Sequence, residues 1–450
     1  MTFQRAFLAV FTAVLMTACG ASAQREPAPG SRPHNVILFI SDGCGPASFT
    51  LARTYVTDVL GGEGLAVDGM LAGAVRTRSA DSRVTDSAAG ATAFACGIKT
   101  NNGALAVDPE GKPHTTVLEA AEARGMATGL VVTSTITHAT PAAFAAHVPS
   151  RGMTAEIATQ EIAQGIEVLF GGGTMDFLPA EAGGSRTDGR NLFDEARDAG
   201  YQIVRTRDDF DGDLHAPVLG LFTPGHMAYE IDRDPAREPS LAEMMRKAID
   251  LLKDDPDGFF LMVEGSRIDH AAHGNDAAAH LHDILAFDEA VAAALDFARA
   301  DGRTLIVSTS DHETGGLTLG RNIDGMGVYA WYPEALEPIR HSNGALWERL
   351  TASGDLAQTL SEETGIRLEE IDGIRRAPLV EAFEDRDAHA FSRAFNEVVS
   401  RKAVLGWTTN GHTGVDVNLY AFGPGRERFI GNHDNTEIGR ILADLLGVEL

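Results

Sequence analysis

An Asp-Ser pair followed by small residues is the strongest local sign of chemistry in the sequence. It occurs as Asp86-Ser87-Ala-Ala-Gly-Ala-Thr-Ala. The small residues favour a helix, so Ser87 is predicted to lie at or near a helix N-terminus. Free backbone N–H groups and the helix dipole at such a position favour a bound phosphoryl group. An ordinary Asp or Ser helix cap explains the pair equally well, so both interpretations stay open on this motif alone.

Carboxylates and histidines with metal-ligand spacing come later in the chain. In Glu264-Gly-Ser-Arg-Ile-Asp269-His270-Ala-Ala-His273, the residues Asp269 and His273 are four positions apart. On a helix they would share one face and could bind one metal ion. Glu264 is a hard oxygen ligand just before this turn. Without further ligands, such a group of acids and histidines is equally typical of a solvated surface.

Two further motifs complete a candidate ligand set. Asp311 and His312 close an apolar run, and His412 lies in a Gly-His-Thr-Gly turn. Six side chains are then of the type that binds zinc: Asp42, Asp269, His273, Asp311, His312 and His412. Six ligands suit two ions that share one substrate, the arrangement used for in-line displacement at phosphorus.

An α/β fold must position these residues, because short apolar runs alternate with helical patterns. The runs predict buried parallel strands at 35–41, 127–133, 165–170, 258–263, 304–310 and 417–422. The helical patterns include 115–124, 154–164, 240–252 and 277–299. We therefore expect a large, mostly parallel central sheet with helices on both faces. Ligands bind beyond the carboxyl ends of such strands. Several polar residues follow the predicted strands closely: Asp42, His138, Thr140, Glu264 and Asp311.

The N-terminal residues are typical of an export signal. Residues 1–23 resemble a signal peptide, and residues 24–33 resemble a linker. A small-x-small sequence ending at Ala23 suits signal peptidase, whereas a Thr-Ala-Cys sequence ending at Cys19 resembles a lipoprotein box. The protein is therefore expected to be periplasmic, either soluble or anchored by lipid at Cys19.

Residues 34–450 are predicted to form a single domain. The segment from about 321 to 403 breaks the alternation of strands and helices. It is interpreted as an insertion over the active-site face, with a second domain as the alternative. Cys44 and Cys96 could pair only if the fold brought them together, and we expect two unpaired core residues. His280 and His282 are expected to face solvent on a helix.

The composition restricts the partners. The chain has 450 residues, 44% hydrophobic and 22% charged, and a formal net charge of -27. This charge argues against nucleic acid or anionic lipid as a partner, since both require basic patches. It also makes phosphate a poor ligand for the bare protein. A phosphate ester would require local positive charge, and bound metal ions are its natural source.

Together the motifs resemble those of alkaline phosphatases and occur in that family's order from residue 35 to the C-terminus. The resemblance rests on Ile-Ser-Asp42-Gly, Asp86-Ser87-Ala-Ala-Gly, Thr140-Pro, Arg151 and the motifs around Asp269, Asp311 and His412. It implies hydrolysis of a broad range of small phosphate monoesters through a phosphoserine on Ser87. Members of this family are often dimers, so a homodimer is a further expectation.

The resemblance also implies two Zn²⁺ and one Mg²⁺ per chain. One zinc would be bound by Asp269, His273 and His412, and the second by Asp42, Asp311 and His312. The magnesium would be bound by Asp42, Thr140 and Glu264.

Arg151 matches the arginine that binds two phosphate oxygens, a role that suits its planar fork of donors. His138 and His270 stand where the enteric bacterial enzymes carry Asp and Lys. We interpret His138 as a residue that binds water near the magnesium. A neutral imidazole there removes negative charge, which predicts weaker magnesium retention and activation by added magnesium.

Two other functions fit part of the pattern. A phosphodiesterase or nucleotide pyrophosphatase would use the same two-zinc scaffold, but Glu264 and Thr140 favour a third metal site. Arg151 favours a terminal phosphate, as in a monoester. A non-catalytic periplasmic binder of metal or phosphate would need no nucleophile, so Ser87 argues against it.

Overall fold

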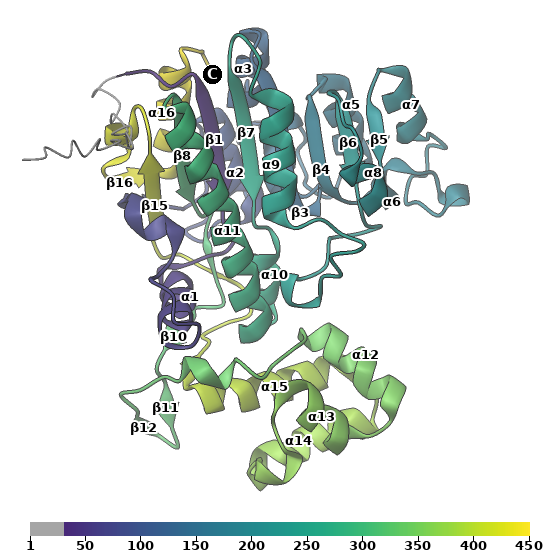
Figure 1. Cartoon of the computed structure of the whole chain (residues 1–450), viewed down its shortest axis with the longest axis vertical. Helices are drawn as coiled ribbons and strands as arrows, with labels where there is room; N and C mark the ends of the chain where they lie inside the picture. The colour runs from purple at the N-terminus through teal and green to yellow at the C-terminus, as the bar shows by residue number, and fades with distance from the viewer. Residues whose placement is uncertain (1–30) are drawn as a thin grey trace, which may run out of the picture.

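A computed structural model gives the structure of residues 31–450 (Figure 1). The predicted signal peptide, including Cys19, and most of the predicted linker lie outside the described residues. One ten-stranded sheet has the order β16-β2-β15-β8-β1-β7-β3-β4-β6-β5. Its strands are β1 Asn35–Ile40, β2 Leu71–Arg76, β3 Ala127–Thr135, β4 Val168–Gly172, β5 Gln202–Val204, β6 Val218–Leu221, β7 Phe259–Glu264, β8 Thr304–Thr309, β15 Val417–Phe422 and β16 Gly431–Asp434. This confirms a large, mostly parallel α/β sheet.

The strand β15 corrects one prediction. It was expected to be parallel, but it runs antiparallel to both β8 and β2. Its Leu419 pairs with Thr309 at the carboxyl end of β8, and Phe422 pairs with Ile306 further back. The chain enters β15 only a few residues after His412. Because His412 lies at the carboxyl edge of the sheet, the strand that follows it can only run away from that edge.

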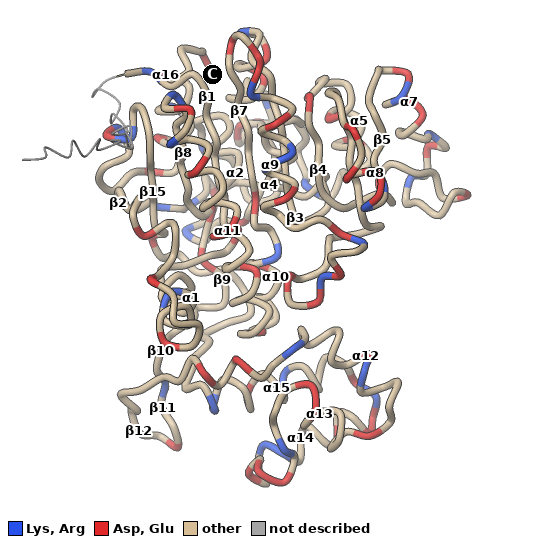
Figure 2. The backbone as a smooth tube through the Cα atoms, viewed as in Figure 1, with Lys and Arg blue, Asp and Glu red and all other residues tan. Residues whose placement is uncertain are grey.

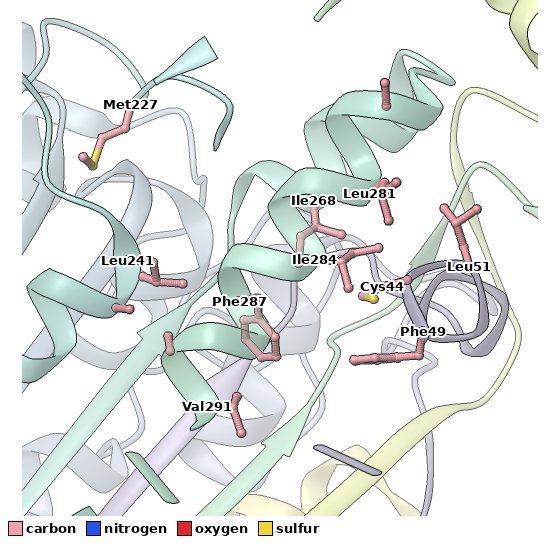
Figure 3. Packing of buried hydrophobic residues seen from close by; sticks show 14 of the residues in the cluster. Cys44, Phe49, Leu51, Met227, Leu241, Ile268, Leu281, Ile284, Phe287 and Val291 are labelled. Atoms are coloured by element: carbon pink, nitrogen blue, oxygen red, sulfur yellow. The ribbon is translucent and has the colours of Figure 1, made fainter. Parts of the chain in front are cut away.

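Alternate side chains of each central strand enter two different hydrophobic clusters, one on each face of the sheet. In β1, Ile37 and Phe39 belong to one cluster, and Val36, Leu38 and Ile40 to the other. This alternation follows from the two-residue period of a strand. On the first face, Phe39 packs edge-on against Phe287 with ring centroids 5.7 Å apart. Figure 3 shows Phe287 in this cluster together with Ile284 and Val291. Burial of such a phenylalanine contributes about 1.5–3 kcal/mol.

Helices cover both faces of the sheet (Figure 1). One cluster includes residues of α1 Pro46–Asp58, α9 Leu241–Leu252 and α11 Ala277–Asp301. The other includes residues of α2 Ser87–Cys96, α3 Val117–Ala123, α4 Ala139–Ala145, α5 Thr154–Gln164, α7 Leu192–Asp198 and α16 Asn435–Leu446. The shorter helices are α6 Thr174–Phe177, α8 Arg207–Asp211 and α10 Arg267–His273. All four predicted helical patterns are present. The start of α9 is fixed by a capping box in which Ser240 accepts from the N–H of Glu243.

The segment predicted as an insertion is mainly helical. It contains β11 Asn322–Ile323, β12 Met326–Gly327, α12 Asn343–Ser353, α13 Leu356–Thr364, α14 Gly373–Glu384 and α15 Ala388–Ala403, and the short β10 Thr318–Leu319 and β13 Leu405–Gly406 flank it. Its helices lie beyond the sheet edge at which β7 ends and α10 begins (Figure 1). Acidic and basic residues both occur along these helices (Figure 2).

Hydrogen bonds connect the insertion to the rest of the chain. Asp232 accepts from the N–H of Ser342 at 3.1 Å, and Asp276 accepts from the N–H of Asn343 at 2.7 Å. Asn396 donates its side-chain amide to the carbonyl of Gly274 at 2.6 Å. The last bond ties α15 directly to the end of α10.

The described cysteines are both buried and unpaired. Cys44 belongs to the cluster on one face of the sheet and Cys96 to the cluster on the other, so the sheet separates them. The prediction of two unpaired core cysteines is confirmed. Within residues 31–450, no helix is long and apolar enough to cross a membrane.

The prediction that His280 faces solvent was wrong. Its ring is fully buried, with Nδ1 2.9 Å from the carbonyl of Ile268 and Nε2 2.8 Å from the Ser48 hydroxyl. The helix α11 packs against both α10 and α1, and these two helices exclude solvent from the side of α11 on which His280 lies. His282, two residues further on, is partly exposed.

Glu161 in α5 is buried with no hydrogen-bond partner for either carboxylate oxygen. Burial and the nearby Asp176 charge raise the pKa of Glu161 well above its ordinary value. The folded protein therefore binds more protons than the unfolded chain above about pH 4.5, and the free energy of unfolding falls as the pH rises. Glu161→Gln should remove this pH-dependent loss and raise the free energy of unfolding by about 1–3 kcal/mol at pH 8.

Chemical denaturation between pH 4 and pH 9 measures this effect. The gain should vanish near pH 4, where Glu161 is protonated in both states. Glu156→Gln, an exposed position in the same helix, is the matched control and should change little. An identical pH profile for wild type and Glu161→Gln would contradict the prediction.

Candidate active site and metal centre

Ser87 is the first residue of α2, as predicted. Asp86 is the helix cap, and its side chain accepts from the N–H of Ala89 at 3.0 Å. Ser87 is 2% exposed, and its Oγ lies 3.3 Å from Nε2 of His312. The cap and the serine therefore have separate roles: Asp86 satisfies the helix end, and the Ser87 hydroxyl lies among the candidate metal ligands.

A close approach of α2 to the strand-end loop after β8 fixes the position of Ser87. A methyl group on Gly90 would lie 3.0 Å from Cβ and 3.2 Å from the carbonyl oxygen of Asp311. Only glycine allows this approach without displacement. The glycine in the Asp-Ser-Ala-Ala-Gly sequence thus lets the helix carry its serine to the metal-ligand residues.

Gly90→Ala should therefore lower kcat/KM by roughly tenfold, because small displacements of reacting groups are costly. Alanine is favoured over glycine inside a helix by about 1 kcal/mol. The free energy of unfolding should therefore not fall together with the activity. Steady-state kinetics and a denaturation curve measure both effects. Gly69→Ala, where an added methyl meets nothing within 4 Å, is the control. Full activity in Gly90→Ala would contradict this account of the contact.

The first ligand group consists of Asp269, His273 and His412. Nε2 of His273 is 3.3 Å from Asp269 Oδ2 and 3.1 Å from Nε2 of His412. Backbone carbonyls hold the other ring nitrogens: Asn410 O is 2.6 Å from Nδ1 of His273, and Thr85 O is 2.8 Å from Nδ1 of His412. Such outer contacts orient both Nε2 atoms toward a shared point, as in protein metal sites.

The second ligand group consists of Asp42, Asp311 and His312, all fully buried. Nε2 of His312 is 3.4 Å from Asp42 Oδ1 and 3.3 Å from Asp311 Oδ2. Thr314 connects this group to the first, since its hydroxyl donates to Asp269 at 2.6 Å and lies 3.2 Å from Nδ1 of His312. The rings of His312 and His412 are stacked with centroids 3.6 Å apart. The two groups are therefore adjacent.

The third ligand group consists of Asp42, His138 and Glu264. Asp42 is thus shared with the second group. The Thr140 hydroxyl is buried without a hydrogen-bond partner, and Ser266 donates to Glu264 at 2.6 Å. The sequence interpretation placed His138 behind a water molecule. A ring nitrogen of His138 lies within 4.8 Å of carboxylate oxygens of both Asp42 and Glu264. That His138 binds water near a magnesium ion stays a prediction.

Asp42, Asp311 and Glu264 are buried in these groups, and none of them forms an ion pair with a lysine or arginine of residues 31–450. Burial and the charges of neighbouring carboxylates raise the pKa of Asp42 well above its ordinary value, and that of Asp311 to about 8. Burial raises the pKa of Glu264 to about 7. Both oxygens of Asp42, Oε1 of Glu264 and Oδ2 of Asp311 have no hydrogen-bond partner. Buried acceptors without a hydrogen-bond partner lower the free energy of unfolding unless cations are bound to them. These residues therefore fit metal ions.

Asp269 differs from the other carboxylates. Although burial opposes it, the hydrogen bond from His273 and the charges of nearby histidines hold the pKa of Asp269 well below its ordinary value. Correspondingly, the hydrogen bond to Asp269 raises the pKa of His273. The first group is therefore the one in which carboxylate and imidazole are already paired.

Arg151 lies beside the helix cap and the third group. Its Nη1 is 3.3 Å from Asp86 Oδ2, and its Nη2 is 2.9 Å from Nε2 of His138. The guanidinium is thus held near the N-terminus of α2, where it could bind an anion next to Ser87. Burial and the Arg151 charge keep the pKa of His138 well below its ordinary value, so this imidazole is neutral.

His270 lies close to His138, with ring centroids 5.4 Å apart, and Nη1 of Arg267 is 2.9 Å from its Nδ1. Burial and the Arg267 charge lower the pKa of His270 to about 3. A third ring, His226, completes the cluster at 5.7 Å from His138 and 4.5 Å from His270. Sequence reasoning missed His226, because it lies in a loop without a recognisable motif.

The structure brings all the predicted site residues to one edge of the sheet. It also adds residues that position them and that spacing could not reveal, namely Thr314, Asn410 and the carbonyl of Thr85. Two of these act through backbone atoms, which leave no signature in side-chain type. A mostly parallel sheet that carries carboxylate–histidine groups beside a buried serine is the architecture of an α/β metallohydrolase.

Comparisons with known proteins specify the class further. The family model for alkaline phosphatase matches residues 33–448. The repressible alkaline phosphatase of Saccharomyces cerevisiae is 42% identical, with 92% of this chain and 82% of the yeast protein covered. Alkaline phosphatase 3 of Bacillus subtilis is 41% identical, with 93% of this chain and 90% of that protein covered. A crystal structure of the cold-active alkaline phosphatase of Shewanella sp. superposes with a TM-score of 0.84 at 34% identity, covering 92% and 99% of the two chains.

The chain belongs to the alkaline phosphatase family and is a phosphoric monoester hydrolase.

Proposed function

We propose that the protein hydrolyses phosphate monoesters through a phosphoserine intermediate on Ser87. The observation that carries the proposal is the position of Ser87 Oγ, at a helix N-terminus and 3.3 Å from a ligand group that shares Asp42 with another. The N–H groups of α2 and the Arg151 guanidinium provide donors for the non-bridging phosphoryl oxygens. Nε2 of His312, the nitrogen beside Ser87 Oγ, also faces Asp42 and Asp311, whereas the base of a serine–histidine–aspartate triad has its aspartate on Nδ1. Metal-assisted ionisation of the serine is therefore favoured over a His–Asp base.

The three ligand groups suit two kinds of ion. Imidazole and carboxylate in the first two groups suit zinc, whereas Asp42, Glu264 and Thr140 offer the oxygen atoms that magnesium prefers. Bound zinc would supply a Lewis acid beside the serine and beside the leaving oxygen. Alkaline phosphatases are metal-dependent, and two structures of the TAB5 enzyme, in variants with a substituted histidine, have Mg bound in a third site. We infer two Zn²⁺ and one Mg²⁺ per chain.

The reaction then has two in-line steps. Ser87 Oγ attacks phosphorus and loses its proton to solvent, and the bond to the ester oxygen breaks on the opposite side, where that oxygen takes up a proton to leave as the alcohol. Water then attacks the phosphoserine from the side that the leaving group has vacated, and Ser87 Oγ regains a proton. Arg151 and the N-terminus of α2 hold the equatorial oxygens throughout. Two displacements predict net retention of configuration at phosphorus.

The relatives support a phosphomonoester substrate. Among them, a streptomycin-6-phosphate phosphatase of Streptomyces griseus is 40% identical, with 66% of this chain and 78% of that protein covered. The residues of the site contact the phosphoryl group alone in this proposal, so a broad range of monoesters follows. Export to the periplasm, a lipid anchor at Cys19 and a homodimer remain proposals that rest on the sequence pattern. Mass spectrometry of the mature N-terminus and light scattering test them.

One experiment tests the function against the phosphodiesterase alternative. Hydrolysis of nitrophenyl phosphate is compared with that of bis(nitrophenyl) phosphate, with and without a chelator. The monoester rate should exceed the diester rate by orders of magnitude, and the chelator should abolish it. A faster diester reaction would overturn the proposal. Metal-independent monoesterase activity would overturn the proposed role of the ions.

Magnesium should activate the enzyme, because His138 offers a neutral nitrogen where a carboxylate would bind this ion more tightly. Protein stripped of metal and restored with zinc alone should reach only part of full activity, and added magnesium should raise it several-fold. His138→Asp should reduce the magnesium concentration required. Full activity with zinc alone, unaffected by magnesium, would contradict this prediction.

A further inference from the structure

Arg267 is a cation beside the site that the reaction described above does not use. It is the first residue of α10, and its guanidinium stacks on the ring of Tyr229, 3.8 Å from the ring centroid. Its Nη1 lies 2.9 Å from Nδ1 of His270, whereas its Nε is buried without a hydrogen-bond partner. Arg267 forms no ion pair with a carboxylate of residues 31–450. An aromatic ring and an imidazole therefore position this charge.

The end of β3 joins the two segments that carry Arg267 and Tyr229. The carbonyl of Thr133 accepts from the N–H of Met227 at 3.1 Å. The hydroxyl of Thr133 accepts from the N–H groups of Ser266 at 3.0 Å and Arg267 at 3.3 Å. One strand residue thus fixes the backbone just before Tyr229 and the backbone at the start of α10. Because the two segments are fixed relative to each other, Tyr229 can hold the guanidinium in one place.

The contact with Arg267 decides which nitrogen of His270 carries the proton. A guanidinium has N–H donors and no acceptor, so Nδ1 of His270 must accept this hydrogen bond with its lone pair. The single proton of the neutral ring is then on Nε2. No atom of residues 31–450 accepts a hydrogen bond from this Nε2–H. His270 therefore presents an N–H donor in a fixed tautomer.

The His270 ring borders the part of the site in which the phosphoryl group would bind. Its centroid is 5.4 Å from that of His138, and Nε2 of His138 is 2.9 Å from Nη2 of Arg151, the proposed phosphoryl-binding arginine. His226 packs against His270 with centroids 4.5 Å apart, and Nδ1 of His226 accepts from the N–H of Thr135 at 3.0 Å. The His270 ring is thus held by its neighbours on more than one side.

We propose that Arg267 is a positioning residue of the active site, which holds His270 as the Nε2–H tautomer from its place on Tyr229 and so provides a further donor for the phosphoryl oxygens. The proposal rests on the proposed phosphomonoesterase function and adds to it a residue that acts on the substrate only through His270. A phosphoryl dianion gains from such a donor, because a positioned N–H stabilises the charge on its oxygens.

Calorimetry with inorganic phosphate tests the proposal without turnover, on the metal-loaded Ser87→Ala protein. Arg267→Met removes the donor but keeps a long unbranched side chain next to Tyr229, and it should weaken phosphate binding by about tenfold. His270→Phe should weaken binding by a similar factor. With both changes together, the dissociation constant should stay within about twofold of that for His270→Phe alone, because Arg267 acts through His270. Effects that add in full, or no effect of Arg267→Met, would overturn the proposal.

Nitrogen NMR of the histidine side chains reports the tautomer directly. In the wild type, Nδ1 of His270 should show the chemical shift of an unprotonated nitrogen and Nε2 that of an N–H group. The signals that are absent from His270→Phe identify this residue. In Arg267→Met the two shifts should move toward each other, because both tautomers are then populated. A proton on Nδ1 of His270 in the wild type would overturn the proposal.

The controls separate this role from a structural one. Arg376→Met, an exposed arginine of α14, is charge-matched and should change neither phosphate affinity nor the NMR spectrum. Metal content should be equal in all variants, because Arg267 and His270 belong to none of the three ligand groups. Loss of metal in Arg267→Met would show a structural role and overturn the proposal. A wild type that hydrolyses no monoester would instead reject the proposed function, and calorimetry and NMR would still decide the role of Arg267.

Discussion

Ser87→Ala is expected to lower kcat for phosphate monoesters by at least about 10³-fold. In the proposed mechanism, the Ser87 hydroxyl receives the phosphoryl group, so its removal stops the first step. Metal content should stay at the wild-type level, because Ser87 belongs to none of the three ligand groups. The free energy of unfolding should change by less than about 1 kcal/mol, since one hydroxyl is removed at a helix end that Asp86 already caps.

Rapid mixing with labelled nitrophenyl phosphate, followed by acid quenching, measures the intermediate directly. Wild-type protein should retain label on the chain at low pH, and Ser87→Ala should retain none. Ser82→Ala, a neighbouring serine outside the site, is the matched control. Residual activity of Ser87→Ala near the wild-type level would refute the covalent mechanism, whatever the metal content.

Asp42→Asn is expected to abolish activity and to disturb two metal sites at once, because Asp42 belongs to both the second and the third ligand groups. An amide has one acceptor oxygen and no charge, so it cannot bridge two cations as a carboxylate does. Metal analysis should show loss at both positions, with the first group retained. Activity should fall by at least about 10²-fold and should not recover at high zinc concentration.

The stability of Asp42→Asn should change sign with metal content. In the metal-free protein, Asp42 is buried without a partner for either oxygen, and Asp311 and Glu264 add repulsion. Removing its charge should therefore raise the melting temperature of the metal-free variant above that of the metal-free wild type. With metals bound, the wild type should be the more stable protein. The exposed Asp58→Asn is the control. A variant less stable than the wild type in both states would contradict the assigned electrostatics.

The sequence was sufficient to predict the central fold because its signals are local. The six predicted strands appear in the sequence as uninterrupted apolar runs, and the four predicted helices appear as segments with helical periodicity. All ten elements occur in the structure. Four strands of the sheet were missed, namely β2, β5, β6 and β16. The strands β5, β6 and β16 have only three or four residues, and β2 has a single buried residue, Val75, so none of them appears as an apolar run. The direction of β15 was predicted wrongly, since apolar composition carries no information about direction. That direction follows from where the preceding His412 has to lie.

The candidate ligands were predictable because residue type restricts metal binding so strongly. The contacts among them were not. The family resemblance implied the shared position of Asp42. The ring of His138 close to Glu264 and the contact of His226 with His270 depend on how distant segments pack. His280 shows the opposite case, in which a helical histidine that resembles a surface residue is buried by a helix from another part of the chain.

The late position of His412 in the chain has a consequence for biosynthesis. His412 follows the insertion, and β15, which joins β8 to β2, follows His412. A chain whose synthesis has not yet reached this region lacks His412, a ligand residue of the first group. It also lacks β15, the strand that pairs with both β8 and β2. Under the proposed function, a chain that stops before His412 should therefore be inert toward phosphate esters, although Ser87 and five of the six zinc-type ligands precede that point.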